Sequence, residues 1–251
     1  MELVKARLPI IGKVKCGEVV NNRPVSLDHF IASGHYAELF NKEYGEKPDK
    51  IEVVFVSDDL ETVCEHRLEI RQGKKLYAYS HDGEEIWAWK PGEDEYKPIL
   101  KKDHPEIMEQ IKAKAGADWY QLLRLRFLLL KIKGIFGMWE FGTRAEASSI
   151  PQILGSIKAV KEYAGTIQNI PFDLVVEKVI SQKPDSKWKF PVVKLICNIG
   201  AENLMLLSEW KGEKIKGLIT EDVIEAQKHK ALPETTEQIT KEAQKLQGTL
   251  L

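Results

Sequence analysis

The sequence predicts an α+β fold: a mainly antiparallel, barrel-like β core with short crossing helices and a C-terminal helical tail. Short β-branched and aromatic runs alternate with glycine-containing turns in both halves of the chain. Segments of helical periodicity separate these runs, and the strand patterns stop after Gly200. We therefore expect one core domain over residues 1–207 and a helical tail over residues 208–251.

The first half, about residues 8–90, is predicted to be a β-meander with short helices before it. A strand is expected over residues 8–15, and Ser26 is placed as the N-cap of a short helix, LDHFIAS, that ends at Gly34. The later elements are a helix in HYAELFNKEYG, a strand at IEVVFV, a single-turn helix capped within Ser57-Asp58-Asp59, and the strands RLEIR, KLYAYS and EIWAWK. The stretch PGEDEYKP after them is expected to be a loop.

The second half, about residues 119–197, is predicted to hold two strand pairs with a helix between them. Before it, Asp103 and Glu106 form a capping-box pattern at the start of the helix HPEIMEQIKAKAG. Strands are expected at about residues 120–131, 135–141, 172–180 and 190–197, with Trp139 and Phe141 in the core. Ser148 or Ser149 is expected to cap the intervening helix, whose apolar stripe is Ile153, Ile157, Val160 and Ala164 and which ends at Gly165. The tail contains two helix-prone stretches, TEDVIEAQKHK and ETTEQITKEAQKLQ.

Composition narrows the classes of function. The 251 residues include 37 basic and 38 acidic side chains, for a net charge of -1, so bulk charge does not draw the chain to nucleic acid. No apolar run approaches the roughly 18 residues that span a bilayer, and the N-terminal stretch lacks a signal-peptide pattern. Three widely spaced cysteines indicate reduced thiols. We expect a cytoplasmic protein of the host cell that has no membrane partner.

Local charge favours a partner- or nucleic-acid-binding surface. The stretch from Trp119 to Trp139 contains four cations and no acid, and Arg124 and Arg126 point the same way if they lie on a strand. The loop after Ser181 places three lysines around Trp188, an arrangement that single-strand-binding β proteins use for phosphates and bases. The candidate residues are Arg124, Arg126, Lys131, Lys133, Lys183, Lys187, Trp188 and Lys189. The competing interpretation is that these cations form the solvent face of an antiparallel sheet.

Patterns for chemistry are weak. The turn MWEFGTRAEASSIPQI has no phosphate-loop, dinucleotide or nucleophile-elbow pattern. Cys64 and His66 would share a strand face and could join His81 in binding a metal, but no close pair of metal ligands supports them. The paired acids Asp58-Asp59 and Glu84-Glu85 fit caps and loops better than a magnesium site. We therefore assign no catalytic residue, metal or cofactor.

Four stretches carry a resemblance to a known family. They are LPIIGKVKCGE, SLDHFIASGHYAELFNKEYGEKPDKIEVVF, LLRLRFLLLKIKGIFGMWEFGTRAEASSIPQI and PFDLVVEKVISQKPDSKWKFPVVKL. Together they resemble the phage recombination directionality factor-like proteins over roughly residues 8–196. The resemblance implies a non-catalytic protein that binds a large serine integrase on attachment-site DNA and switches it from integration to excision.

Two alternatives remain open at the level of sequence. One is a single-stranded DNA-binding protein of a phage replication module, which would use the basic residues and Trp188. The other is a metal-dependent hydrolase, because many members of the family carry hydrolase or metal-binding labels.

Overall fold

A computed structural model describes residues 8–21, 23–89, 96–181 and 189–209 of the chain. The chain divides into two units, Met1–Ile199 and Gly200–Leu251. In chain order, the described elements of the first unit are β1 (Ile10–Val20), β2 (Arg23–Ser33), α1 (Ala37–Tyr44), β3 (Lys50–Val54), α2 (Leu60–Val63), β4 (Cys64–Gln72), β5 (Lys75–Ser80), β6 (Glu85–Trp89), β7 (Tyr96–Leu100), α3 (Ile107–Ala115), β8 (Tyr120–Leu129), β9 (Met138–Thr143), α4 (Ser149–Ala164), β10 (Pro171–Ile180) and β11 (Lys189–Cys197).

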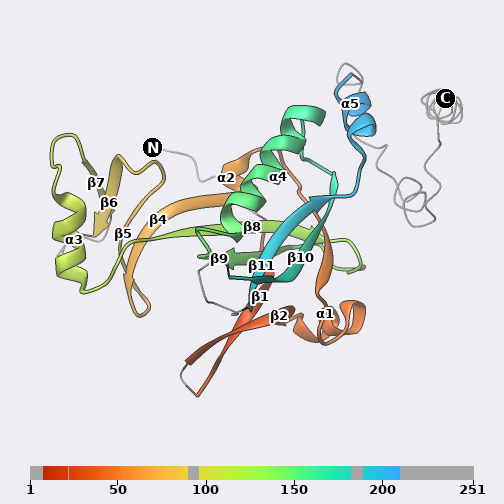
Figure 1. The fold of residues 1–251 in the computed structure, drawn as a ribbon, viewed down its shortest axis with the longest axis horizontal. Coiled ribbons are helices and arrows are strands. Elements are labelled where there is room, and N and C mark those ends of the chain that lie inside the picture. The colour runs from red at the N-terminus through yellow and green to blue at the C-terminus, as the bar shows by residue number, and fades with distance from the viewer. Residues whose placement is uncertain (1–7, 22, 90–95, 182–188, 210–251) are drawn as a thin grey trace, which may run out of the picture. The chain divides into compact units, whose positions relative to one another are not determined.

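The strands form one open sheet, shown in Figure 1, whose main order is β11-β10-β3-β8-β4-β5-β6-β7. Strand β9 pairs with β8 and with β1, and β1 pairs with β2. The β1–β9 pair is parallel and the other pairs between named strands are antiparallel. The predicted α+β class is therefore broadly right, but the barrel-like core is wrong, because the sheet does not close. Closure requires the end strands to pair, and β11 pairs with β10 whereas β7 pairs with β6.

Strand β8 organises the core. Its residues Leu123, Leu125 and Phe127 are fully buried, and they alternate with Arg124 and Arg126. Strand side chains point to opposite faces in turn, so one face of β8 is apolar and the other is charged.

Trp139 and Phe141 lie on the apolar side, in register with Phe127 and Leu125. They are 1% and 0% exposed, which confirms their prediction as core residues. The Trp139 ring lies 5.7 Å from the ring of Phe40 on α1, and aromatic packing thus joins α1 to the sheet.

A second hydrophobic cluster supports the meander. Ile70, Ala78 and Ile86 from β4, β5 and β6 pack against Ile111 and Ala115 of α3. Helix α3 was expected, but its capping box is not observed: the helix begins at Ile107, with Glu106 at the N-cap and no capping hydrogen bond from that side chain. The end of the predicted loop is also wrong, because residues 96–98 belong to β7.

The segment LDHFIAS is a strand, and its predicted helix is wrong. It belongs to β2, which pairs with β1 from Arg23 to Ser33. Phe30 is fully buried and its ring packs edge-on against Phe141 at 6.1 Å. Pairing with β1 and burial of this ring outweigh the local helical pattern.

Helix α4 packs against β11 and buries the predicted stripe. Ser148, one of the two residues expected to cap the helix, occupies the N-cap, but its side chain makes no capping hydrogen bond. Ser149 is 2% exposed, and its Oγ accepts a 2.9 Å hydrogen bond from the backbone N–H of Val193. The serine therefore ties α4 to β11. Gly165 ends the helix in the left-handed conformation, as expected.

Of the second unit, the structure describes α5 (Ala201–Glu209). The predicted tail, with its two helix-prone stretches, lies almost wholly outside the described residues, so the boundary at residue 207 stays a prediction. Among the described helices, none combines the length and apolar character that crossing a membrane requires.

Candidate functional site

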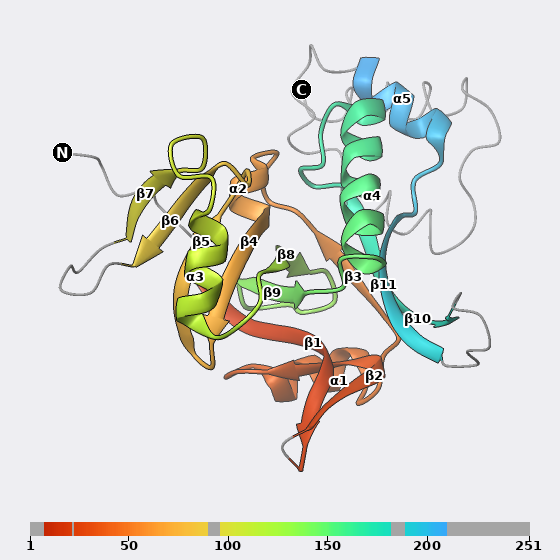
Figure 2. The same ribbon diagram turned by 60° about the vertical axis from the view of Figure 1, so that its left-hand side comes forward.

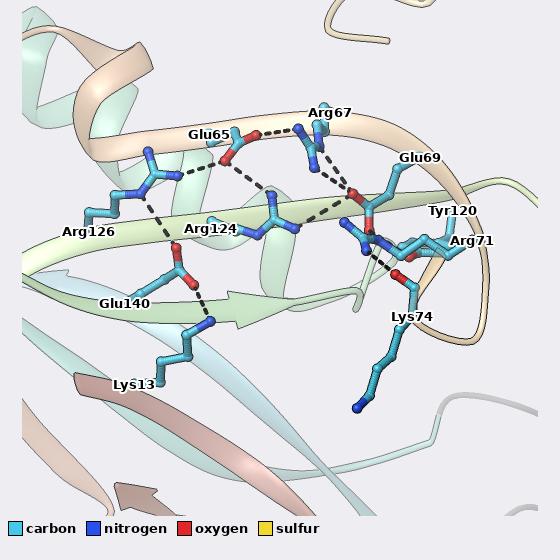
Figure 3. Close-up of polar contacts among 10 residues, drawn as sticks. All are labelled: Lys13, Glu65, Arg67, Glu69, Arg71, Lys74, Tyr120, Arg124, Arg126 and Glu140. Carbon is cyan, nitrogen blue, oxygen red and sulfur yellow. Dashed lines mark hydrogen bonds and ion pairs between the residues drawn. The ribbon is translucent and has the colours of Figure 1, made fainter. Parts of the chain in front are cut away.

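Four neighbouring strands present charged side chains on one face of the sheet, as Figure 3 shows. Glu140 follows Trp139 on β9, so the Trp139 ring lies on the other face. Side chains two residues apart share a face, and the register places Glu65 beside Arg124 and Glu140 beside both Arg126 and Lys13. We call this set the arginine–glutamate face. Its members are Glu65, Arg67, Glu69 and Arg71 of β4, Arg124 and Arg126 of β8, Glu140 of β9 and Lys13 of β1.

Glu65 is held by three arginines. Its Oε1 lies 2.8 Å from Nη1 of Arg67, and its Oε2 lies 3.2 Å from Nη1 of Arg124 and 2.8 Å from Nη2 of Arg126. Burial raises the pKa of Glu65, but the surrounding guanidinium charges outweigh it and hold the pKa below its ordinary value. The carboxylate is therefore ionised at neutral pH.

Glu69 is the most deeply buried member, with 1% of its side chain exposed. It accepts hydrogen bonds from Arg67 Nη2 at 2.8 Å, Arg71 Nε at 2.8 Å and the Tyr120 hydroxyl at 2.6 Å. Burial acts to raise the pKa of Glu69, but these donors bring it down to about 2. Burial and the nearby carboxylate raise the pKa of Tyr120 to about 12. Both groups keep one protonation state across the physiological range.

Glu140 extends the face to the other side of β8. It lies 3.5 Å from Arg126 Nε and 3.2 Å from Lys13 Nζ. The Nε atom of Arg126 is buried and has no hydrogen-bond acceptor among the described residues, so its contact with Glu140 is an ion pair alone. The network thus connects β4, β8, β9 and β1.

The face offers fixed charge rather than proton transfer. Its five cations exceed its three carboxylates, and the arginine side chains stay protonated at every accessible pH. The depressed pKa values of Glu65 and Glu69 make these two carboxylates poor general acids at neutral pH. What this arrangement can do chemically is hold its strands together and present oriented guanidinium groups to a partner.

The structure describes five of the eight predicted binding residues, and these five lie on β8, in the β8–β9 connection and at the start of β11. Arg124 and Arg126 belong to the arginine–glutamate face, where their side chains are only 20% and 19% exposed. Lys131 lies 3.3 Å from Glu52, and its Nζ lies 5.1 Å from the centre of the Tyr44 ring. Lys133 and Lys189 are exposed. Lys183, Lys187 and Trp188 lie outside the described residues.

Sequence reasoning missed two kinds of residue. Two of the acids that pair with the arginines, Glu65 and Glu69, come from β4, and their signal was the alternating run Glu-x-Arg-x-Glu-x-Arg from Glu65 to Arg71. The second is Phe136, which is 68% exposed in the β8–β9 connection that also holds Lys131 and Lys133. An aromatic side chain beside two lysines in a turn was the available signal.

The candidate metal residues have structural surroundings. Cys64 is buried, which raises its pKa to about 12, and His66 Nε2 lies 3.0 Å from Oε1 of Gln121. Cys64, His66 and His81 all line one open groove, but the described ranges hold no group of three or more His, Cys, Asp or Glu side chains placed to bind a metal ion.

The first pair of adjacent acids stabilises turns. Asp58 accepts hydrogen bonds from the Thr166 hydroxyl at 2.8 Å and the Ile167 N–H at 2.7 Å. Burial raises the pKa of Asp58, but these bonds outweigh it and lower the pKa below its ordinary value. Asp59 caps α2 by accepting a 3.1 Å bond from the Glu61 N–H, as the sequence predicted.

The second pair, Glu84-Glu85, lies in the β5–β6 turn. The backbone N–H groups of both residues donate to Oδ1 of Asp82, at 2.8 and 2.9 Å. These bonds use the Asp82 carboxylate, and the Glu84 carboxylate lies 3.8 Å from Lys101 Nζ.

Together these features describe an α+β scaffold with a fixed-charge sheet face and an open groove. The chain belongs to the recombination directionality factor-like family, whose model matches residues 11–198. The match confirms the resemblance and places the chain in an accessory, generally non-catalytic family with a role in recombination. No curated protein and no solved structure matches the chain significantly.

Proposed function

We propose that this protein binds a large serine integrase on attachment-site DNA and switches it from integration to excision without performing chemistry itself. The observation that carries the proposal is the family match over residues 11–198, which overlaps every strand of the described sheet. The proposed partner is the integrase, and the DNA is reached through it.

Binding alone is sufficient for such a switch. A protein changes the outcome of a reaction when it binds one arrangement of the recombining assembly more tightly than another. Moving a two-state balance from 1:99 to 99:1 takes about 5.5 kcal/mol of differential binding. A protein interface of ordinary size supplies that free energy through a few well-packed contacts.

The arginine–glutamate face supports a role in recognition. Its guanidinium groups are held by Glu65, Glu69 and Glu140, so their orientation is set before a partner arrives. Oriented charges of this kind contribute to the specificity and rate of protein association. The groove beside the face is a second feature suited to a partner.

A gel-shift experiment tests the proposal. The purified chain is mixed with labelled attachment-site DNA, with and without the integrase encoded beside it. We expect a slower band only when integrase is present, because the chain acts on the integrase–DNA complex. An unchanged integrase–DNA band at saturating protein would contradict the proposal.

One observation favours a second candidate function, single-stranded DNA binding. Phe136 is 68% exposed, and Lys131 and Lys133 lie in the same β8–β9 connection. Exposed aromatic rings stack on bases while nearby cations contact phosphates. If the chain alone binds single-stranded DNA, loses affinity steeply as salt rises, and is weakened by Phe136→Ala, this second function gains and the integrase proposal loses.

A further inference from the structure

On the side away from β8, the first four residues of β4 pair with no strand in the part of the chain that the structure describes. Pairing with β8 begins at Cys64, whereas pairing with β5 on the opposite edge begins at Leu68. Backbone groups of an antiparallel strand alternate between its two neighbours. Residues 64–67 therefore direct part of their N–H and C=O groups away from β8. The Cys64 N–H donates to the Leu60 C=O of α2, and the other outward groups form an edge that can template another strand.

This edge borders an open groove. Residues 64–67 all line a groove of about 930 Å³, and consecutive strand residues line one groove together when it runs along the strand edge. Four strand residues extend over about 13 Å. Tyr79 and His81, at the end of β5, also line the groove.

Helix α4 forms the facing wall. Its lining residues are Leu154, Ile157, Lys158, Lys161 and Glu162. They follow the i, i+3, i+4, i+7, i+8 spacing of a single helix face. In Figure 2, α4 lies across from α2 and the start of β4, and residues of all three elements line the groove. A strand edge on one side and a helix face on the other is a geometry that admits an extended peptide.

We infer that the groove between β4 and α4 accepts an extended peptide segment of a partner protein, which adds as a strand to residues 64–67. In this mode, main-chain hydrogen bonds to the strand edge supply affinity and alternate side chains supply specificity. The inference rests on the proposed function only in naming the integrase as the source of the peptide.

The lining residues define the chemistry of the peptide. Leu60, which is 40% exposed, and the half-buried Leu154 offer apolar contacts to it. Lys158 is 78% exposed and lies 3.9 Å from Glu162, and the Lys161 ammonium donates to the Asp58 C=O. Each ammonium has three N–H groups, so both lysines keep donors for a carboxylate of the peptide. The arginine–glutamate face already neutralises the Glu65 carboxylate. The complementary peptide therefore carries apolar and acidic side chains in alternation.

Nucleic acid fits the groove less well. Besides Glu65, the lining includes Glu61 and Glu162, and the Glu162 side chain is 65% exposed. A polyanionic backbone would pass close to these carboxylates, whereas a peptide with a few acidic side chains can avoid them. The groove also has apolar lining from Leu60 and Leu154, which a phosphate backbone cannot use.

Hydrogen exchange on the full chain, with and without the integrase, tests the inference. We expect the amides of residues 64–67 to be protected in the complex. Leu154→Glu should weaken integrase binding about tenfold or more, because it places a carboxylate where the apolar and acidic peptide lies. Ala159→Glu is the matched control: Ala159 is exposed on the same helix and does not line the groove. The affinity of the Ala159→Glu variant for the integrase should stay within about twofold of that of the wild type.

A synthetic probe makes the test independent of the integrase. A labelled peptide of about eight residues with alternating valine and glutamate should bind the wild-type chain more tightly than its valine–lysine counterpart. Leu154→Glu should remove this preference and Ala159→Glu should keep it. Circular dichroism and melting temperature establish that both variants are folded.

The possible results separate the two proposals. If integrase binds but residues 64–67 stay unprotected and Leu154→Glu binds like Ala159→Glu, the groove inference is overturned and the proposed function stands. If the integrase does not bind, the proposed function fails, and the groove inference is then tested by the two synthetic peptides alone. Equal binding of the valine–glutamate and valine–lysine peptides would overturn the groove inference. If residues 64–67 become protected in the chain alone as its concentration rises, the groove binds a second copy of this chain, and the inference of a partner peptide is overturned.

Discussion

The guanidinium of Arg126 lies 2.8 Å from Oε2 of Glu65, although the residue directly opposite Glu65 on β8 is Arg124. Both arginines of β8 therefore converge on one carboxylate of β4. Their charges are committed to the sheet before any partner is bound. Changes at these arginines are thus expected to alter stability as well as recognition.

Replacing Arg124 should destabilise the fold. Arg124→Met leaves the Glu65 and Glu69 carboxylates short of a cation in a partly buried setting, and the free energy of unfolding should fall by about 2–3 kcal/mol. Lys131→Met is the control, because the Lys131 side chain is 48% exposed and its pair with Glu52 should contribute less than about 1 kcal/mol. Urea unfolding measures both. Equal losses would show that the face has no special structural role.

Stability should depend on pH through Glu69. Its pKa in the folded chain is about 2, below the ordinary value of 4.5. A depressed folded pKa contributes stability that is present above the unfolded pKa and is lost as pH falls toward the folded pKa. Between about pH 5.5 and 2.5 the wild type should therefore lose about 2–3 kcal/mol more than Glu69→Gln. If urea unfolding shows that the free energies of unfolding of the wild type and Glu69→Gln fall equally with pH, this prediction is contradicted.

The sequence revealed the arginines of β8 but not the carboxylates that pair with them. Alternation predicted that Arg124 and Arg126 share a face, and the structure confirms it. Their partner Glu65 lies 59 and 61 residues earlier in the chain. Strand register over such a separation depends on the whole sheet, so local pattern could not show that acids oppose these cations. For the same reason, the approach of α4 to residues 64–67 was not predicted.

Most of the elements, by contrast, were visible in the sequence. Helix α4, its stripe and its end at Gly165 follow from local spacing, as do β10 and β11. The misassigned segment, β2, contains Phe30, whose burial against Phe141 is a tertiary contact. Closure of the sheet also failed as a prediction, because it depends on the end strands, which no local pattern describes.

Gly12 should be required by the packing of Trp139. A Cβ at residue 12 would lie 2.4 Å from the indole Cζ3, and the Trp139 ring is buried, so it cannot move away into solvent. Gly12→Ala should lower the free energy of unfolding by about 1–3 kcal/mol. Gly155→Ala is the contrast, because a Cβ there meets no atom within 4 Å in the middle of α4.

The Gly155→Ala variant should be more stable than the wild type by about 0.5–1 kcal/mol, since alanine loses less backbone entropy in a helix. Thermal melts of both variants measure the pair. An unaffected Gly12→Ala protein would mean that the β1–β9 contact around Trp139 is looser than the structure shows.

Truncating the Trp139 side chain should be among the most damaging single changes. Trp139 is 1% exposed, and Trp139→Ala should cost about 3–5 kcal/mol. Tyr163→Ala, on the outer side of α4 where the ring is 48% exposed, should change stability by less than about 0.5 kcal/mol. Circular dichroism with urea distinguishes them. A mild effect at Trp139 would place the core elsewhere.

The central claim is that this chain changes the direction of recombination by binding an integrase. An in vitro recombination assay with the adjacently encoded large serine integrase tests it directly, using both the integration and the excision pairs of attachment sites. We expect the protein to stimulate excision and to inhibit integration. The amount of protein needed for the full effect should rise in proportion to the amount of integrase. Unchanged yields on both site pairs, with folded protein and active integrase, would contradict the account.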